Sequence, residues 1–501
     1  MTADRGTGSE GTGRDVHAAA LAGLGELATR MFVAGRWRGS SDGSEIEVGD
    51  PATGEVVARV ANGTVTDATA AVDAAVAALP GFAALAPRTR AEMLRRAFEL
   101  MTRRAEDLAR LVVLENGKAL KDARGEVAYA AEFFRWFSEE AVRNTGEVMT
   151  APAGANRILV VRQPIGVAAL VTPWNFPAAM LTRKIGPALA AGCTVVCKPA
   201  TETPLTALAI ARILEEAGVP AGVVNVAASN RSSAFVGAWL ADPRVRKLSF
   251  TGSTEVGRVL LAAASHNVVS CSMELGGNAP FVVFADADLD AAIDGAMVAK
   301  MRNGGEACTA ANRFVVERPV ARVFADRLAA AMADLRVGPG LVDGVDVGPL
   351  VNEKSRDKVA DLVGAAVAAG ASTLLGGVVP GGRGWFYPPT VLAGVEPGSP
   401  ILRDEIFGPV APVVAFDTEA EAVALANDTE YGLVSYVYTE DLSRGLRVAE
   451  ALEAGMVGLN RGLVSDPAAP FGGTKQSGLG REGGHEGMLE YLEAKYIATS
   501  W

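Results

Sequence analysis

The chain has 501 residues, of which 49% are hydrophobic and 21% are charged. This length suits roughly three domains of about 150 residues, and the composition is that of globular proteins, which excludes fibrous and largely disordered classes. Acidic residues outnumber basic ones by 58 to 47, which gives a net charge of -11. Because such a chain is repelled by phosphate backbones and anionic lipids, neither nucleic acid nor a membrane is an expected partner.

Cysteine usage and the first residues bear on the compartment. Four cysteines, Cys193, Cys197, Cys271 and Cys308, are too few for a disulfide framework in so long a chain, which favours a reducing cytoplasm. Residues 1–15 are rich in glycine, serine and threonine and contain no apolar run, which argues against a signal peptide. We expect residues 1–30 to form a disordered or weakly ordered tail.

The first 120 residues after this tail divide into strands and helices. Residues 31–61 are short, alternating and rich in turn residues, a pattern that predicts strands and hairpins. Three segments then place apolar residues at spacings of three and four with charges between them, which predicts helices over 66–79, 88–115 and 121–144.

From residue 157 onwards, valine-rich runs alternate with helical patterns. Such strands, buried on both faces and joined by helical crossovers, predict a parallel doubly wound sheet whose ligand site lies at the carboxyl ends of its strands. A second series of the same kind starts at residue 279 and continues to about residue 460. The final segment, 491–501, is a lone predicted strand that pairs either with 157–163 or with a neighbouring subunit. The expected fold class is therefore α/β.

Three loops at predicted strand ends carry unusual residues. The loop 172–177 has the sequence TPWNFP, in which two prolines bracket Asn175, and the loop 250–257 has the sequence FTGSTEVG, which leads into a helix. A glycine followed by a helix amino terminus favours a phosphate, although the glycine spacing matches neither a dinucleotide fingerprint nor a P-loop. The third loop, 303–314, sets Cys308 among small residues, where a substrate could approach the thiol.

Cys308 and Glu274 are the residues that could carry covalent chemistry. The other three cysteines lie in apolar strands, which is typical of inert buried thiols. None of the three histidines, His17, His266 and His485, lies near a comparable loop, so a Cys–His hydrolase is disfavoured. Glu274 ends an apolar strand just before two glycines, where partial burial would raise its pKa and suit it to act as the base.

Seven motifs in order, PWNFP, KPA, FTGSTEVG, MELGG, the loop around Cys308, EIFGPV and PFGGTKQSG, resemble the aldehyde dehydrogenase superfamily. The resemblance covers residues 31–501 and implies NAD(P)+-dependent oxidation of an aldehyde through a covalent thioester, without a metal. It further implies a Rossmann-like NAD(P)-binding domain of residues 31–152 and 165–274 and an α/β catalytic domain of residues 275–472. Residues 153–164 and 485–501 would form small oligomerisation strands, in a homodimer or homotetramer.

The resemblance assigns roles to particular residues. Cys308 would be the nucleophile, Asn175 with the Cys308 backbone N–H would hold the oxyanion, and Glu274 would activate the hydrolytic water. Glu482 matches a glutamate to which some members of the family give a role in proton relay. The cofactor would be bound by Thr172, Pro173, Trp174, Lys198, Thr201, Gly252, Ser253, Gly257, Leu275, Glu405 and Phe407.

The segments around Arg183, Arg302 and Ser465 resemble succinate-semialdehyde dehydrogenases, in which two arginines and a serine hold the substrate carboxylate. A guanidinium binds a carboxylate through two parallel hydrogen bonds, so the residue types suit this substrate. Glutaric semialdehyde or an aromatic or aliphatic aldehyde stays open as the substrate. A thiol hydrolase that uses Cys308 and Glu274 without a nucleotide, and a binding protein that retains the fold, are further alternatives.

Three positions bear on details of the chemistry. Ala310 stands where some relatives carry a second cysteine, so a vicinal disulfide switch is excluded. Glu306 replaces the commoner glutamine two residues before Cys308, and we expect its negative charge to raise the pKa of the thiol. Thr201 stands where NAD-preferring relatives often have glutamate, which favours NADP+, although NAD+ and a repulsive effect of Glu202 stay open.

Overall fold

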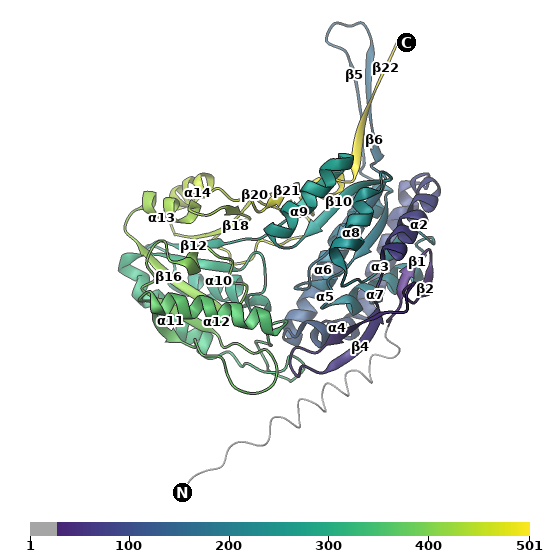
Figure 1. Ribbon diagram of the computed structural model, residues 1–501. Helices are drawn as coiled ribbons and strands as arrows, with labels where there is room; N and C mark the ends of the chain where they lie inside the picture. Colours follow the sequence, from purple (N-terminus) through teal and green to yellow (C-terminus); the bar gives the residue numbers. More distant parts are fainter. Residues whose placement is uncertain (1–27, 501) are drawn as a thin grey trace.

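The computed structural model describes residues 28–500, and it has two lobes and a projecting strand pair. Figure 1 shows one lobe in purple and teal, the other in green, and the strands β5, β6 and β22 extending from the first lobe. Nearly all of the predicted tail, 1–30, lies outside the described residues. Within these residues no single helix is long and apolar enough to cross a membrane, and one apolar helix pair, 65–103, is bent by 120°.

The amino-terminal region forms strands and then helices, as the residue patterns predict. The predicted helix 88–115 is two helices, because the backbone leaves the helical conformation at Arg104, whose guanidinium binds the Glu216 carboxylate at 2.6 and 3.0 Å. The elements are β1 (Met31–Val33), β2 (Arg36–Arg38), β3 (Glu45–Gly49), β4 (Val56–Ala61), α2 (Val65–Ala83), α3 (Pro87–Arg103), α4 (Ala105–Asn116) and α5 (Leu120–Glu140).

The first lobe is built on an eight-stranded sheet with the order β2-β1-β9-β8-β7-β10-β11-β21. The five strands from β9 to β11 are parallel, and antiparallel strands flank them at both edges. The elements are β7 (Val167–Val171), α6 (Pro177–Ala191), β8 (Thr194–Lys198), α7 (Pro204–Glu216), β9 (Val224–Val226), α8 (Ser232–Ala241), β10 (Val245–Thr251), α9 (Thr254–Ala264), η1 (Ser265–Asn267), β11 (Ser270–Glu274) and β21 (Gly478–Leu479).

Alternating side chains of this sheet pack into two hydrophobic cores. Val195 and Cys197 of β8 face the core formed with α3 to α7, whereas Val196 faces the core formed with α2 and α8. Helices therefore cover both faces, and the predicted doubly wound parallel sheet is confirmed. The strand order reverses between β7 and β10, so the loops that follow these two strands meet at one edge of the sheet.

The second lobe contains a seven-stranded sheet with the order β14-β15-β16-β13-β12-β18-β19, parallel except for β14. This is the predicted second α/β series. Its elements are β12 (Ala279–Val283), α10 (Leu289–Met301), η2 (Arg302–Gly305), β13 (Ala311–Glu317), α11 (Arg318–Ala333), α12 (Glu353–Ala368), β14 (Ser372–Leu375), β15 (Thr390–Ala393), η3 (Pro400–Leu402), β16 (Val410–Phe416), α13 (Glu419–Asn427), β17 (Tyr431–Gly432), β18 (Val434–Tyr438), α14 (Leu442–Ala451), β19 (Met456–Leu459) and β20 (Thr474–Lys475).

The projecting sheet has the order β22-β6-β5, formed by β5 (Glu147–Thr150), β6 (Arg157–Pro164) and β22 (Leu492–Thr499), which follows the short helix α15 (Glu486–Leu489). Antiparallel pairing of β22 with β6 gives the carboxy-terminal strand one of its two predicted partners. Strand β5, which precedes the predicted boundary at residue 153, also pairs with β6, so the projecting sheet includes residues 147–150. All four residues of β5 are exposed, so its sequence lacks the apolar alternation that marks a half-buried strand.

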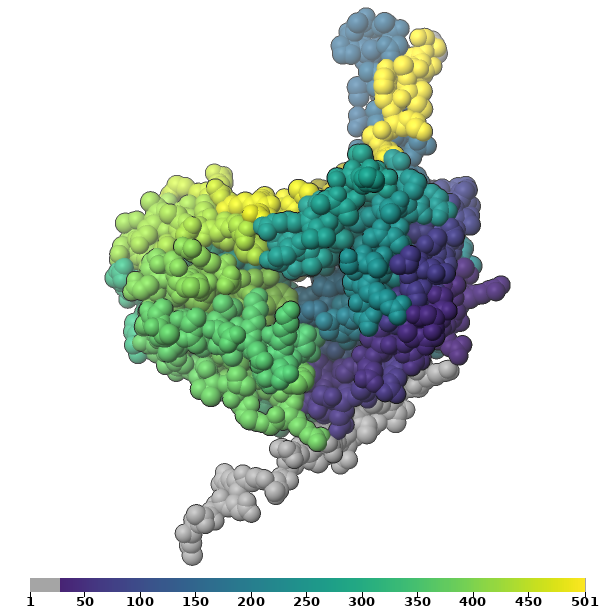
Figure 2. All heavy atoms as spheres, in the orientation of Figure 1, coloured from purple at the N-terminus to yellow at the C-terminus, as the bar shows by residue number. Residues whose placement is uncertain are grey.

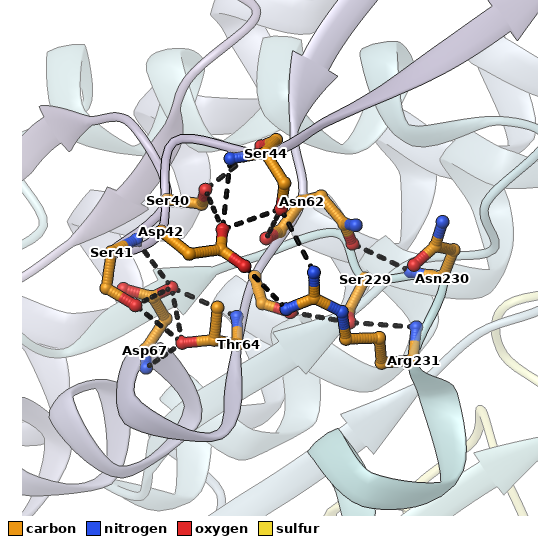
Figure 3. Close-up of polar contacts among 11 residues, drawn as sticks. Ser40, Ser41, Asp42, Ser44, Asn62, Thr64, Asp67, Ser229, Asn230 and Arg231 are labelled. Carbon is orange, nitrogen blue, oxygen red and sulfur yellow. Dashed lines mark hydrogen bonds and ion pairs between the residues drawn. The ribbon is translucent and has the colours of Figure 1, made fainter.

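A polar junction joins the start of α2 to the loop that follows β9 (Figure 3). The Asp67 carboxylate accepts hydrogen bonds of 3.0 Å from the backbone N–H groups of Ser41 and Thr64. The Thr64 hydroxyl accepts from the Asp67 N–H in return, which completes a capping box. Arg231 binds Asp42 at 2.8 Å on the other side of the junction. The junction thereby joins the connection between β2 and β3 to the start of α2 and to the loop that follows β9.

Replacing Asp67 tests the strength of this junction. Burial alone would raise the pKa of Asp67, but the hydrogen bonds from Ser41 and Thr64 outweigh it and hold the pKa below its ordinary value. The carboxylate therefore stabilises the fold above about pH 4, and this contribution is lost as the pH falls through the lowered pKa. We expect Asp67→Ala to lower the free energy of unfolding at pH 7 by about 1–3 kcal/mol in chemical denaturation.

The matched control is Asp73→Ala on the same helix, because the Asp73 side chain is 58% exposed and pairs only with Arg244 at the surface. This control should change the free energy of unfolding by less than about 0.5 kcal/mol. Equal effects of the two substitutions would contradict the role of the junction.

Candidate active site

A cavity of about 230 Å³ lies where the two lobes meet. Figure 2 shows the molecule hollowed between the teal and green segments. Residues from both lobes line the cavity, namely Pro173, Trp174, Asn175, Met180, Thr251, Gly252, Ser253, Leu275, Gly276, Cys308, Ser355, Lys358, Glu405, Ile406 and Phe407. The loops after β7 and β10 contribute to it, so the cavity opens at the point where the strand order reverses, which is where doubly wound sheets bind ligands.

Cys308 lies in the loop between η2 and β13, with its side chain partly exposed to the cavity. The loop passes so close to the end of β11 that a Cβ atom on Gly277 would lie 2.2 Å from the Cys308 carbonyl oxygen. Burial, together with Glu405 and Glu274, raises the pKa of the Cys308 thiol to about 12, whereas Arg183 and Arg302 lower it. The thiol of the ligand-free protein is therefore largely protonated at neutral pH.

Asn175 contacts the nucleophile loop directly. Its side-chain nitrogen donates to the carbonyl oxygen of Glu306 at 3.0 Å, and Asn303 donates to the carbonyl oxygens of both Asn175 and Glu306 at 3.0 and 2.9 Å. Asn303 adopts a left-handed backbone conformation, with φ of 56°, which places its side chain between the two loops. These bonds hold Asn175 in the wall of the cavity that Cys308 also lines.

A buried ion pair between Lys118 and Glu126 holds the loop that contains Asn175. Lys118 Nζ lies 2.6 Å from Glu126 Oε2 and donates to the Asn175 carbonyl oxygen at 2.7 Å. The second oxygen of Glu126 accepts from the backbone N–H groups of Ala178 and Ala179, at the amino terminus of α6. One pair of charges thus positions both the Asn175 loop and the helix that carries Arg183.

Glu274 is buried at the end of β11, and both of its carboxylate oxygens lack a hydrogen-bond partner within the described part of the chain. Burial and the neighbouring Glu482 raise its pKa. Burial also opposes ionisation of Glu482, but Arg183 and Lys184 outweigh it and hold the pKa of Glu482 below its ordinary value. Glu482 is therefore the ionised member of this pair, and Glu274 retains its proton closer to neutral pH.

The two arginines of the predicted carboxylate site each lower the pKa of the Cys308 thiol, which indicates that both lie near it. Arg183 is buried, forms an ion pair with Glu482 at 2.5 Å and lies 4.3 Å from the centre of the Phe471 ring. Arg302 lies 5.4 Å from the centre of the Phe176 ring. Aromatic faces thus support both guanidinium groups.

Ser465 is placed less tightly than the two arginines. It lies half-buried on the irregular loop that follows β19, six residues after the end of that strand and six before Phe471. Its neighbour Val464 packs against the core of the second lobe. The loop therefore has an anchor beside Ser465, while the hydroxyl itself lies outside the set of residues that lines the cavity.

Glu405 and Phe407 form the wall of the cavity that belongs to the second lobe. Glu405 Oε1 accepts from the Gly277 N–H at 3.0 Å, and burial raises the pKa of this carboxyl to about 7. Phe407 has a φ of 57° and packs edge-on against Trp174, with the ring centres 5.3 Å apart. These contacts join the two lobes across the cavity.

The residues after β10 leave room for a ligand near the backbone. Ser253 caps α9 by accepting from Val256 N–H, so the helix begins at the cavity. A Cβ atom on Gly257 would lie 2.5 Å from the Leu275 side chain, so glycine lets α9 approach the sheet. The amino terminus of α9 consequently points at the cavity, where it favours an anion.

Lys198, Thr201 and Thr172 lie beside the cavity at the ends of β8 and β7. Lys198 is buried, which lowers the pKa of its amine to about 8, and its carbonyl oxygen accepts from the Thr172 N–H at 3.2 Å. The Thr201 hydroxyl donates to Glu202 at 3.1 Å. The Glu202 carboxylate is thus held beside Thr201.

The expectation that Glu306 raises the pKa of the thiol by its charge is not what the structure shows. The charges that act most strongly on the Cys308 thiol are those of Arg183, Glu405, Glu274 and Arg302. The Glu306 carboxyl is buried, accepts from the Val351 N–H at 3.1 Å, and has its pKa raised by burial to about 8. It is neutral at pH 7 and fastens the nucleophile loop to residue 351.

The sequence analysis did not identify several residues of the site. Ser355 and Lys358 of α12 line the cavity, and Lys358 Nζ donates to the Glu405 carbonyl oxygen at 2.7 Å. Nothing in the local pattern of α12 separates Lys358 from an ordinary surface lysine. Asn303, in contrast, precedes two glycines, and an asparagine before glycine is a sign of left-handed backbone that could have been used.

This fold and cavity define an α/β protein with a doubly wound sheet and a cysteine on the wall of the cavity between its two lobes. The model of the aldehyde dehydrogenase family matches residues 37–497, so the chain belongs to this family. The family uses NAD(P), and the chain is an aldehyde dehydrogenase.

Three relatives and one solved structure show where in the family the similarity is high. The succinate-semialdehyde dehydrogenase of Paenarthrobacter nicotinovorans is 58% identical over 89% of this chain and 99% of its own. The glutarate-semialdehyde dehydrogenase of Pseudomonas aeruginosa is 50% identical, and the NADP(+) succinate-semialdehyde dehydrogenase GabD of Escherichia coli is 49% identical, each over 93% of this chain and 97% of its own. The structure of succinate-semialdehyde dehydrogenase from Burkholderia pseudomallei matches with a TM-score of 0.94 and 48% identity, over 96% and 99% of the two chains.

Alkylation of Cys308 tests the electrostatics of the thiol. Because only the thiolate reacts and the pKa lies near 12, we expect the rate with iodoacetamide to be low at pH 7 and to rise about tenfold per pH unit towards pH 10. Arg302→Gln should slow alkylation at each pH, because it removes a positive charge that stabilises the thiolate. Peptide mapping separates Cys308 from the partly buried Cys271, and a rate independent of pH would contradict this account.

Thermal unfolding of Glu306→Gln tests the neutral state of Glu306. The unfolded carboxyl has an ordinary pKa and the folded one a pKa of about 8, so the native state becomes less stable as the pH rises between these values. Glutamine keeps the acceptor for Val351 and avoids this cost. We therefore expect the Tm of the variant relative to the wild type to increase from pH 5 to pH 8. A Tm difference that stays constant over this range would show that Glu306 is ionised in the folded protein.

Proposed function

We propose that the protein oxidises succinic semialdehyde to succinate with NADP+, through a thiohemiacetal and a thioester at Cys308. The observation that supports this substrate is the buried Arg183, whose Nη2 donates to the sulfur of Met180 at 3.2 Å. Met180 lies on the wall of the cavity that contains Cys308. A thioether is a weak acceptor for a buried guanidinium, and a substrate carboxylate would replace it. The names of the relatives from Paenarthrobacter and Escherichia support this substrate.

The chain's own residues would supply nucleophile, donors and base. The Cys308 thiol gives its proton to solvent, and its sulfur attacks the aldehyde carbon. An amide hydrogen of Asn175 with the Cys308 N–H stabilises the resulting oxyanion, where loss of one donor typically costs about 10²–10³ in rate. Glu274 takes a proton from the water that hydrolyses the thioester, and its raised pKa suits a base that works near neutral pH. When bound, NADP+ supplies the acceptor for the aldehyde hydride.

The residues around the cavity fit a nucleotide cofactor. The amino terminus of α9 with Gly252 and Ser253 would face the pyrophosphate, and Glu405 with Phe407 would hold the nicotinamide riboside. Lys198 and Thr201 would bind the ribose next to the adenine. Since Thr201 is neutral and can donate a hydrogen bond, it accepts a 2′-phosphate better than a glutamate would, although Glu202 lies next to it. We therefore propose a preference for NADP+ over NAD+.

Glutaric semialdehyde is the second candidate substrate. It carries the same carboxylate and aldehyde groups separated by one more methylene, and the relative from Pseudomonas aeruginosa is named for it. One methylene in a binding pocket changes the free energy of binding by about 1–3 kcal/mol, so the two substrates differ in rate rather than in chemistry.

We also propose a homodimer or homotetramer in the cytoplasm. The projecting sheet leaves the edges β5 and β22 and the apolar side chains of Val148, Met149, Tyr496 and Ile497 exposed, which is typical of a surface that a second copy covers. All four cysteines are free, which suits a reducing compartment.

The assay follows the absorbance of reduced cofactor with succinic or glutaric semialdehyde and NADP+ or NAD+. We expect kcat/KM to be highest for succinic semialdehyde with NADP+, and Cys308→Ala to abolish the signal. A higher kcat/KM with NAD+ would refute the cofactor preference. A higher value with an uncharged aldehyde such as butanal would refute the carboxylated substrate, and a signal that persists in Cys308→Ala would refute the covalent mechanism.

A further inference from the structure

A buried tyrosine hydroxyl near the predicted carboxylate site lacks a partner. Tyr129 belongs to α5, which packs against the helix α6 that carries Arg183. Its ring packs edge-on against Phe133, with 4.8 Å between ring centres. Among residues 28–500, the hydroxyl oxygen is buried and makes no well-formed hydrogen bond. Burying a hydroxyl without a well-formed hydrogen bond costs about 1–3 kcal/mol, which a hydrogen bond to a bound ligand would offset.

The surroundings of this hydroxyl are those of an anion site. The charges that act on Tyr129 are the guanidinium groups of Arg183 and Arg302, together with the more weakly acting Glu482, and the Arg183 guanidinium also approaches the hydroxyl oxygen as a hydrogen-bond donor. The hydroxyl hydrogen is then the group without an acceptor. Burial raises the pKa of the Tyr129 hydroxyl despite the two arginines, so it is protonated near neutral pH and can donate a hydrogen bond.

Like the Tyr129 hydroxyl, an outer nitrogen of Arg183 makes no well-formed hydrogen bond to an oxygen atom within residues 28–500. Its ion pair with Glu482 uses the inner nitrogen Nε, and Phe471 covers one face of the guanidinium. Its outer nitrogen Nη2 donates to the sulfur of Met180, which lines the cavity. Two buried donors, one charged and one neutral, therefore lie together without an oxygen acceptor that satisfies both.

We propose that the Tyr129 hydroxyl donates a hydrogen bond directly to the substrate carboxylate, alongside Arg183 and Arg302, and thereby selects aldehydes that carry a carboxylate. This inference rests on the proposed function, because it requires a carboxylated substrate. A carboxylate offers about four lone-pair sites, so two guanidinium groups leave an acceptor for a third donor. A neutral donor fixes the orientation of the carboxylate without adding a charge that burial would penalise.

The experiment measures kcat and KM of Tyr129→Phe for succinic semialdehyde and for butanal, which has the same carbon chain without the carboxylate. Hydrogen bonds to charged groups are worth enough that we expect KM for the semialdehyde to rise about tenfold to a hundredfold, with kcat within about twofold of the wild type. The kinetic constants for butanal should change by less than about twofold. The substitution removes one oxygen that has no partner in the ligand-free protein, so the fold should be retained.

Tyr387→Phe is the matched control, because the Tyr387 hydroxyl is also buried without a well-formed hydrogen bond but belongs to the core of the second lobe. It should leave the constants for both substrates unchanged. Equal losses with both substrates in Tyr129→Phe would show a structural role, and unchanged constants with both would show no contact; either result overturns the proposal.

The same measurements separate this proposal from the proposed function. If the wild type does not prefer the semialdehyde over butanal, the carboxylated substrate is refuted, and Tyr129 loses its ligand with it. If the wild type has this preference and Tyr129→Phe keeps it in full, only the role of Tyr129 is refuted.

Discussion

The active site depends on the buried ion pair between Lys118 and Glu126. Lys118 holds the backbone of Asn175, and Glu126 caps the amino terminus of α6, so one ion pair positions both Asn175 and the helix that carries Arg183. Breaking such a pair leaves a buried charge without its partner and typically costs about 3–5 kcal/mol. Lys118 and Glu126 precede Pro173, the first of the residues that line the cavity, by 55 and 47 positions. The geometry of the site therefore depends on how α4 and α5 dock against the sheet.

The balance of positive and negative charges around Cys308 is the second constraint on the active site. Arg183 and Arg302 favour the thiolate, whereas burial, Glu405 and Glu274 oppose it. Glu482 neutralises part of the positive charge and keeps Glu274 protonated closer to neutral pH. The thiol, the base and the arginines are therefore one electrostatic unit, in which no group can be replaced without a change in the protonation of the others.

Much of the fold could be predicted because the spacing of apolar residues along each segment indicates which of its residues are buried. The valine-rich strands β7 to β13 and the helices between them have the pattern that their burial requires, and the loops with Asn175 and Cys308 stood out by composition. The exposed strand β5 has no such pattern, and Lys118, Glu126 and Lys358 act through partners far away in the sequence. The side-chain direction of Glu306, which turns from the thiol to Val351, cannot be deduced from a position two residues before Cys308.

The segment between residues 478 and 499 has a consequence for the order of folding. It supplies β21 at the edge of the first sheet, β22 on β6, Glu482 beside Arg183 and Lys184, and Glu490 beside the buried Lys247. During synthesis, these partners emerge roughly 200 to 340 residues after the groups they contact. Until then three buried cations lack their counterions and a long strand lacks its neighbour, so the first lobe cannot complete its core before the second lobe has been made.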